Sequence, residues 1–345
     1  RRASATIRRH RWLPIPMHDT ILVTGGAGYI GAHMVKALRQ AGFRPVVLDD
    51  LSSGHRGAVR GEQLHVGDAG DAVFVGGVLD EAKPAAVIHF AGSIQVGESV
   101  LDPGKYFRNN VSATQVLLDA MRARDIRRFI FSSTAAIFGE PQYVPIDEVH
   151  PKAPINPYGR SKWFVEQMLE DYDHAHGLKS VCLRYFNAAG ADPDGEIGER
   201  HEPETHLLPL ILQVASGRRD QIGVHGDDYP TPDGTCVRDY VHVADLCDAH
   251  LLALRQLLEG GGSARYNLGN GNGFSVREVL DAVRRITGHP IPATILPRRA
   301  GDPPSLVADS RAARAALGWT PRYPELDTIV AHAWAWEQRI AAEAV

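Results

Sequence analysis

Residues 21–31 limit what this chain can fold into more than any other stretch. Residues 21–24 suit a buried strand and run directly into glycines spaced G-x-x-G-x-x-G, after which a helical apolar pattern continues to Gly42. Such a strand, turn and helix N-terminus present backbone N–H groups and the positive end of the helix dipole to a phosphate, and the missing side chains let it come close. The sequence predicts a pyrophosphate-binding turn at Gly25, Gly28 and Gly31.

The next predicted strand, residues 45–48, ends in an acidic pair, Asp49 and Asp50. This pair follows the glycines by roughly 20 residues, where an acidic side chain binds the adenosine ribose hydroxyls and repels a 2′-phosphate. A solvated acidic pair at a strand end is the alternative interpretation. In this context we predict an NAD site.

The chain then alternates between apolar runs and helical patterns. Strands are expected at residues 63–68, 85–92, 128–133 and 180–185, and helices at about 105–123 and 158–174. This alternation predicts an α/β fold of the Rossmann type, a doubly wound parallel sheet that binds ligands at the carboxyl ends of its strands. The residues expected at those ends are Asp49, Asp68, Ala91, Ser133 and Phe186.

The pattern changes at about residue 191, where a polar stretch begins. We predict an NAD-binding domain over residues 20–190 and a smaller α/β substrate domain over 191–345, with some chain returning to the first. Within the second domain, Ser275 and Glu278 are expected to form a capping box for a helix ending near Gly288. Asp309 is expected to cap a helix that ends at Gly318.

Residues 1–19 stand apart, because residues 1–16 hold five arginines and no acidic residue. One interpretation is a basic targeting segment. The simpler one, which we favour, is that Met17 is the true start and that the preceding residues are upstream sequence or a disordered tail.

Composition narrows the class of protein. A formal net charge of −4 over 345 residues gives no basic field for nucleic acid. No apolar run approaches the ~18 residues of a transmembrane helix. The cysteines, Cys182, Cys236 and Cys247, are scattered and odd in number, which predicts a reducing cytoplasm rather than a disulfide framework. No histidine pair has H-E-x-x-H or comparable spacing, so no metal site is predicted.

Tyr158 and Lys162 carry the candidate chemistry. They are four residues apart and therefore share one face of the predicted helix. A phenol is a poor base at neutral pH, but a neighbouring ammonium and an oxidised nicotinamide both favour the phenolate. Thr134, just after the preceding strand, offers a hydroxyl to the same site. Thr134 would hydrogen-bond a substrate oxygen while Tyr158 removes its proton and the nicotinamide takes a hydride.

Taken together, these motifs resemble those of a known protein family. The glycine turn, a Ser/Thr strand end and Y-x-x-x-K resemble the extended short-chain dehydrogenase/reductase superfamily. Further segments match one of its families, the UDP-glucose 4-epimerases, in the family's order from about residue 20 to the C-terminus. They are residues 25–31, 89–92, 96–99, 109–111, 132–139, 156–159, 184–187 and 237–240.

The resemblance implies an NAD-dependent enzyme that interconverts UDP-galactose and UDP-glucose at C4 through a 4-keto sugar, with Tyr158 as base. It also implies a homodimer formed through helices of the first domain. The NAD would stay bound between cycles. Together with the motif residues, the cofactor would contact Gly25, Gly28, Tyr29, Ile30, Gly31, Asp49, Asp50, Leu51, Ser52, Ser53, Gly54, Asp68, Ala69, Phe90, Ala91, Gly92, Asn109, Thr134, Tyr158, Lys162 and Phe186.

The UDP-sugar is expected to bind in the second domain. Guanidinium forks suit a diphosphate, although Arg299 could form a solvated basic edge with Arg298, and Arg238 could form an ion pair with Asp239 or Asp245. The substrate-binding residues that the resemblance implies are Thr134, Tyr158, Asn187, His206, Leu207, Arg238, Arg299 and Asp302.

Two departures from the family pattern concern specificity and cofactor contact. Ser93 and its neighbours supply no lysine after H-F-A-G, and Leu306 stands where some relatives have a tyrosine in the sugar pocket. A smaller residue there would admit N-acetylated sugars. The same motifs also fit a UDP-xylose/UDP-arabinose epimerase or a non-catalytic NAD-binding sensor. Dehydratases of this fold need carboxylates after the strand-end threonine, where this chain has Ala135 and Ala136.

Overall fold

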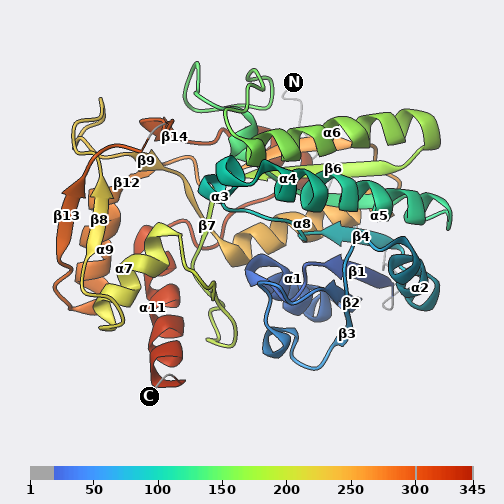
Figure 1. Cartoon of the computed structure of the whole chain (residues 1–345), viewed down its shortest axis with the longest axis horizontal. Coiled ribbons are helices and arrows are strands. Elements are labelled where there is room, and N and C mark those ends of the chain that lie inside the picture. The colour runs from blue at the N-terminus through green and yellow to red at the C-terminus, as the bar shows by residue number, and fades with distance from the viewer. Residues whose placement is uncertain (1–18, 300, 344–345) are drawn as a thin grey trace, which may run out of the picture.

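The computed structural model of this protein describes residues 19–299 and 301–343 (Figure 1). Apart from Asp19, the predicted N-terminal extension lies outside the described residues, as does Met17. Among the described residues, no helix combines the length and the apolarity that crossing a membrane would require.

The larger part of the molecule is built on a parallel sheet of seven strands in the order β11-β6-β5-β4-β1-β2-β3. The strand order reverses between β1 and β4, which makes this the topological switch point where such sheets bind ligands. The prediction of a doubly wound parallel sheet is confirmed. Its strands are β1 (Thr20–Thr24), β2 (Arg44–Asp49), β3 (Gln63–Val66), β4 (Ala86–His89), β5 (Arg128–Thr134), β6 (Lys179–Tyr185) and β11 (Ala264–Leu268).

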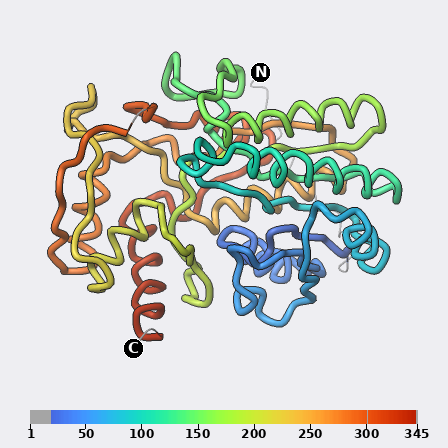
Figure 2. The backbone as a smooth tube through the Cα atoms, in the orientation of Figure 1, coloured from blue at the N-terminus to red at the C-terminus, as the bar shows by residue number. Residues whose placement is uncertain are grey.

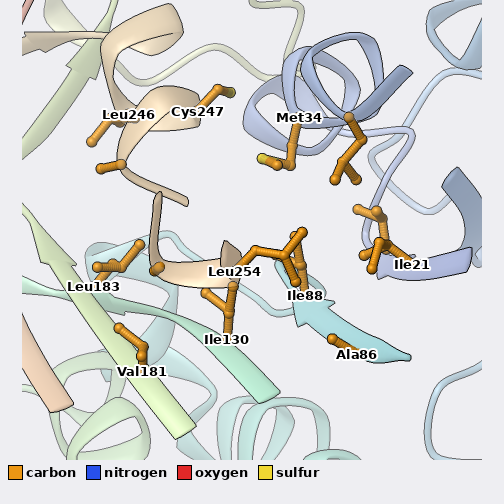
Figure 3. Packing of buried hydrophobic residues seen from close by; sticks show 14 of the residues in the cluster. Ile21, Met34, Ala86, Ile88, Ile130, Val181, Leu183, Leu246, Cys247 and Leu254 are labelled. Atoms are coloured by element: carbon orange, nitrogen blue, oxygen red, sulfur yellow. The ribbon is translucent and has the colours of Figure 1, made fainter. Parts of the chain in front are cut away.

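Both faces of the sheet are covered, and this explains why its strands are continuous apolar runs. In β1, Ile21 and Val23 pack into the core on one face and Leu22 into the core on the other. Figure 3 shows the first of these cores, with Met34 and Leu254 closing over the strands. That face is covered by α1 (Tyr29–Gln40), α8 (Val243–Leu258) and α10 (Arg311–Leu317), and the opposite face by α2 (Ala72–Ala82), α5 (Ala113–Arg122) and α6 (Pro157–His176).

The helix expected at residues 105–123 is more complex than predicted. It begins as α4 (Pro103–Tyr106), passes through a π-helical segment, η2 (Phe107–Ser112), and continues as α5. π-helical turns inside helices occur frequently at functional sites, and this one carries Asn109 and Asn110. The short elements nearby are η1 (Arg56–Val59), α3 (Val96–Leu101) and η3 (Ala135–Ile137).

A smaller α/β lobe lies beside the sheet, at the left of Figure 1. The lobe has a hydrophobic core of its own, the third core of the molecule. It is enclosed by α7 (Leu207–Ala215), α9 (Val276–Thr287) and α11 (Leu326–Glu343). Figure 2 shows the chain crossing between the two parts, since α8 and β11 return to the large sheet. The division of roles at residue 190 stays a prediction. The paired short strands are β7 (Asn187–Ala189) with β10 (Tyr240–His242), β8 (Ile222–His225) with β13 (Ala293–Leu296), and β9 (Val237–Arg238) with both β12 (Phe274–Ser275) and β14 (Ser305–Leu306).

One of the two predicted caps is correct, and the other is displaced by one residue. The Ser275 hydroxyl accepts the Glu278 N–H at 3.1 Å, and the Glu278 carboxylate accepts the Ser275 N–H at 2.7 Å, which completes the capping box. The N-cap position of α10 is Ser310, whose side chain accepts no helix N–H, whereas Asp309 Oδ1 accepts the N–H of Arg311, the first helical residue, at 3.0 Å. The Ser310 hydroxyl bonds the backbone of Gly269, and this anchors the start of α10 to the end of β11.

Candidate active site

The glycine turn is built so that no side chain fills it. Gly25 has a φ of +70° and donates its N–H to Leu48 O at 2.8 Å. A Cβ added to Gly31 would lie 2.1 Å from Gly25 O, and one added to Gly25 would lie 2.5 Å from Ala91 N. Gly28 is the N-cap of α1. The bare backbone at the start of α1 therefore fits the pyrophosphate that the sequence predicts there.

The two aspartates at the end of β2 have different hydrogen-bond partners. Asp49 is buried, and its carboxylate accepts Ala27 N–H at 2.9 Å and Leu51 N–H at 2.8 Å. Asp50 is exposed, and its carboxylate accepts both the N–H and the hydroxyl of Ser52. Asp49 thus holds the glycine turn in shape, in addition to the ribose contact predicted for it. Among the neighbouring predicted cofactor residues, Leu51 has a φ of 60°, Ser53 is exposed, and a Cβ on Gly54 would lie 2.8 Å from Asp49 Oδ1.

The remaining predicted cofactor residues of the first strands lie at the start of α1 and after β3. The Tyr29 hydroxyl donates to Gly190 O at 2.6 Å, so α1 is tied to the segment that enters the smaller lobe. Ile30 packs against the core under α1. Asp68, after β3, is exposed and accepts Gly70 N–H at 2.7 Å, while Ala69 is buried.

The loop after β4 is held by two asparagines of the π-helical segment. Phe90 N and Ala91 N both donate to Thr24 O, which keeps the loop against the end of β1. The Asn109 amide donates to the Ser93 hydroxyl at 2.9 Å, and Asn110 binds both the N–H and the carbonyl of Ser93. Asn110 was not predicted as a site residue. It is buried next to Gly92 and also donates to Ser161 Oγ at 3.0 Å, which links this loop to α6.

Tyr158 lies in the first turn of α6, opposite the end of β5. The helix begins here because Asn156 caps it, accepting Gly159 N–H at 2.8 Å, and Pro157 occupies its first turn. The Thr134 hydroxyl lies close enough to the Tyr158 phenol to influence its ionisation. Burial raises the pKa of Tyr158 above 10.0, and the Thr134 hydroxyl opposes this rise. The structure therefore brings together the two residues that the sequence predicts as the base and its hydroxyl partner.

Lys162 follows one helical turn later and is buried below the end of β5. Its Nζ donates to Ser132 O at 3.0 Å and lies 4.9 Å from the centre of the Phe131 ring. Burial lowers the pKa of Lys162 to about 8, so the side chain still carries its proton at neutral pH. We expected the neighbours of Tyr158 to lower its pKa, but the protein alone does not do so. Burial disfavours the charged phenolate more strongly than the neighbouring groups stabilise it.

A buried ion pair supports this helix face and was not predicted. Glu166 lies four residues after Lys162, pairs with Arg184 at 2.6 Å and accepts the Ser133 hydroxyl at 2.6 Å. Next to it, the Ser132 hydroxyl bonds the Tyr185 hydroxyl. The i, i+4, i+8 spacing from Tyr158 was the available signal, since it places Glu166 on the same helix face.

Arg238 and Asp302, both predicted to bind substrate, are paired with each other. Arg238 Nη2 donates to the Asp302 carboxylate and Nη1 donates to Val237 O at 2.7 Å. The two aspartates considered as partners from the sequence are engaged elsewhere. Asp239 accepts backbone N–H groups of three other residues, and Asp245 accepts those of two. These contacts hold the Arg238 guanidinium in one orientation before any substrate binds.

The other predicted substrate residues lie on elements around the junction of the two parts. Asn187 opens β7 next to Tyr240, and Leu207 opens α7 and packs on the third core. His206 caps α7, and its Nδ1 contacts the Glu199 carboxylate. Phe186, which was predicted to contact the cofactor, packs with Leu306 against one small cluster. Arg299 is exposed and accepts Asp302 N–H at its carbonyl, at 3.3 Å, whereas Arg298 pairs with Asp228 at 2.6 Å and covers the Tyr229 ring.

The comparisons with known proteins agree with this geometry. A model of the NAD dependent epimerase/dehydratase family matches residues 21–269, which is more than half of the chain. The chain belongs to this family. Within the family, it is 52% identical over 318 residues to a UDP-glucose 4-epimerase of Halalkalibacterium halodurans, with 92% of this chain and 95% of that protein covered.

Two solved structures of family members are also similar. One is a UDP-glucose 4-epimerase from Brucella ovis in complex with NAD, with a TM-score of 0.90, 52% identity and coverage of 92% of this chain and 97% of that one. The other is from Bifidobacterium longum in complex with NAD⁺ and UDP, with a TM-score of 0.89, 38% identity and coverage of 93% and 98%.

Proposed function

We propose that this family member is an NAD-dependent UDP-glucose 4-epimerase, which interconverts UDP-galactose and UDP-glucose at C4. The observation that carries the proposal is the meeting of Thr134, Tyr158 and Lys162 at the end of β5, on the same sheet edge as the glycine turn. Relatives that match the chain over more than nine-tenths of its length carry this activity in their names.

The roles of the three residues follow from their positions. Tyr158 takes the proton from the sugar 4-hydroxyl and later returns it, with Thr134 hydrogen-bonded to the same oxygen. Lys162 holds the cofactor ribose and contributes a positive charge that favours the phenolate. NAD, held by the glycine turn and Lys162, would supply the hydride acceptor and donor that a change of configuration at C4 requires. Arg238 holds the diphosphate while the sugar turns.

The glycine turn and its surroundings supply the cofactor site of the proposal. A bare helix N-terminus at Gly28, an acidic end of β2 at Asp49 and the loop from Phe90 to Gly92 lie around the switch point of the sheet. Because the reaction regenerates NAD⁺ in each cycle, we expect the protein to keep it through purification.

The experiment uses purified protein to which no cofactor has been added. It is incubated with UDP-galactose, and UDP-glucose is assayed with a coupled dehydrogenase after the epimerase has been removed by filtration. Conversion supports both the reaction and a resident NAD. If no conversion occurs, even after NAD is supplied, the glucose/galactose assignment is wrong. UDP-arabinose is then tested, and absence of turnover there favours a non-catalytic NAD-binding sensor.

A second candidate function, favoured by Leu306, is the epimerisation of N-acetylated UDP-sugars as well. Its side chain lies in the same small cluster as Phe186, which follows β6, and β14 sets it opposite Arg238 in register. A leucine is shorter than a tyrosine and leaves room for an N-acetyl group. Comparable turnover of UDP-N-acetylgalactosamine and UDP-galactose supports this, and turnover of UDP-galactose alone refutes it.

We also propose that the protein is a homodimer and works in the cytoplasm. The contacting helices α3 and α6 carry exposed apolar side chains, among them Val100, Leu101 and Phe164. An exposed apolar patch of this kind marks an interaction site. The three cysteines are buried free thiols, which fits a reducing compartment.

A further inference from the structure

The loop between β7 and α7 connects the two parts of the molecule. Its Gly190 carbonyl accepts the Tyr29 hydroxyl from α1, and its Asp192 pairs with Lys36 of α1 at 2.7 Å. On the other side, Trp336 of α11 donates its indole N–H to Glu199 O at 2.9 Å. A ligand that orders this loop would therefore also set the position of α1 relative to the smaller lobe.

Four side chains of this loop converge on one point. Glu199, His201, Glu204 and His206 each offer one ligand atom, and these atoms all lie within 4.8 Å of one another. His201 Nδ1 lies 3.1 Å from Glu199 Oε1 and 3.8 Å from Glu204 Oε2. His206 Nδ1 contacts the same Glu199 oxygen and lies 4.0 Å from Glu204 Oε1.

The burial of this cluster calls for positive charge. Glu199 is only 8% exposed, and in the described parts of the chain it and Glu204 form ion pairs only with these two histidines. Two buried carboxylates favour two positive charges close by, in addition to the Thr205 and His206 N–H groups that Glu204 Oε1 accepts. Two imidazolium ions supply them in one arrangement, and one divalent cation bound to neutral imidazoles supplies them in another.

We propose that Glu199, His201, Glu204 and His206 form a binding site for one divalent transition-metal ion, of which zinc is the best match. Two imidazoles and two carboxylates are a ligand set that zinc accepts in tetrahedral geometry. With bonds of about 2.0–2.1 Å, neighbouring ligand atoms of such a site are roughly 3.4 Å apart. In this cluster, His201 Nδ1 lies 3.1 Å from Glu199 Oε1, and the four ligand atoms all lie within 4.8 Å of one another, so small side-chain shifts would bring them to that spacing.

The ion would bind both histidines through Nδ1 and would release the proton from each of those nitrogens. Metal at Nδ1 fixes the proton of His206 on Nε2, which makes the opposite edge of the ring a hydrogen-bond donor. His206 is also a proposed substrate residue at the start of α7, so this consequence rests on the proposed function. The metal site itself does not, because binding is measured without substrate.

The experiment measures metal in the full-length protein, produced without a polyhistidine tag. The protein is stripped with dipicolinate, dialysed and reloaded with Zn²⁺ or Co²⁺, and bound metal is counted by mass spectrometry. We expect one ion per chain, a visible absorption of four-coordinate Co²⁺, and a rise of several degrees in Tm on reloading. Less than one-fifth of an ion per chain, with no cobalt band and no shift in Tm, overturns the proposal.

A variant and a matched control locate the site. His201→Gln combined with Glu204→Gln removes two of the four ligands, and we expect at least a tenfold loss of affinity for Zn²⁺. His174→Gln changes an exposed histidine at the end of α6 and is expected to keep one ion per chain. Circular dichroism and bound NAD show whether the double variant is folded. Full metal binding by a folded double variant contradicts the assignment.

Discussion

The carboxylate of Asp49 accepts the N–H of Ala27 at 2.9 Å, so the end of β2 holds the glycine turn that follows β1. The second oxygen of Asp49 accepts Leu51 N–H at 2.8 Å. One buried acidic group thus fixes the backbone on both sides of the proposed adenosine site. In an exposed turn the glycines alone would leave this backbone free to move.

Asp49→Asn is therefore expected to destabilise the turn. An amide has one acceptor oxygen, so its NH₂ group must face one of the two backbone N–H groups, and we expect the free energy of unfolding to fall by about 1–3 kcal/mol. Bound NAD should fall as well. Urea unfolding and NAD content measure both effects. Asp50→Asn alters an exposed side chain and should change stability by less than about 0.5 kcal/mol; equal losses in the two variants contradict the assignment.

Tyr158→Phe tests the base. The change keeps the ring and removes the hydroxyl, so we expect kcat to fall by roughly 10²–10⁴-fold. Bound NAD should change little, since the ring still fills its place in α6. The control is Tyr143→Phe, whose exposed hydroxyl bonds Asp147 at 2.7 Å. A Tyr158→Phe variant that keeps kcat within threefold of the original protein argues against the proposed chemistry.

Lys162→Met separates stability from activity. Because burial lowers the pKa of Lys162 from 10.5 to about 8, the unfolded chain binds its proton more tightly between these pH values. Stability of the original protein therefore rises with pH across this window, and below pH 8 the buried charge costs roughly 3 kcal/mol. Since the variant lacks that cost, it should be more stable at pH 7 and show a weaker pH dependence from 8 to 10.5.

The same variant should lose at least 100-fold in kcat, because the positive charge beside Tyr158 is gone. Urea unfolding at pH 7 and pH 9.5 supplies the stability comparison, and the coupled UDP-glucose assay supplies the rate. An unchanged pH dependence of stability would show that Lys162 is not the buried titrating group.

Arg238→Lys tests how the diphosphate is held. A lysine keeps the charge and can still pair with Asp302, but it lacks the planar fork that binds two phosphate oxygens. We expect KM for UDP-galactose to rise about tenfold or more, with kcat within a few-fold. Arg298→Lys is the matched control, since Arg298 pairs with the exposed Asp228. If both variants raise KM equally, Arg238 has no special role.

The helix pair α3 and α6 is the proposed dimer surface. Val100 is 62% exposed and Leu101 is 87% exposed, and replacing both with glutamate places charges where a partner would bury apolar surface. We expect the molar mass measured by light scattering to fall by half. Val73→Glu alters an 86% exposed valine on α2 and should leave the dimer intact. A monomeric original protein refutes the proposal.

What the sequence alone determined was local. The glycine turn, the capping box at Ser275 and the Tyr158–Lys162 spacing are set by backbone geometry within a few residues, so their patterns are readable without the fold. The doubly wound sheet also followed, because continuous apolar strands alternating with helices leave few arrangements besides it. At α10 the helix begins one residue later than predicted, after Ser310, whose hydroxyl bonds the distant Gly269.

The tertiary structure alone decided which distant groups meet. Glu166 with Arg184 and Arg238 with Asp302 are pairs whose partners are separated by 18 and 64 residues, and no local period predicts such contacts. The four side chains that meet at Glu199, His201, Glu204 and His206 are close in sequence, yet their loop has no helical or strand period to show which of them face one another. Packing between elements fixes these distances, and packing depends on the whole chain.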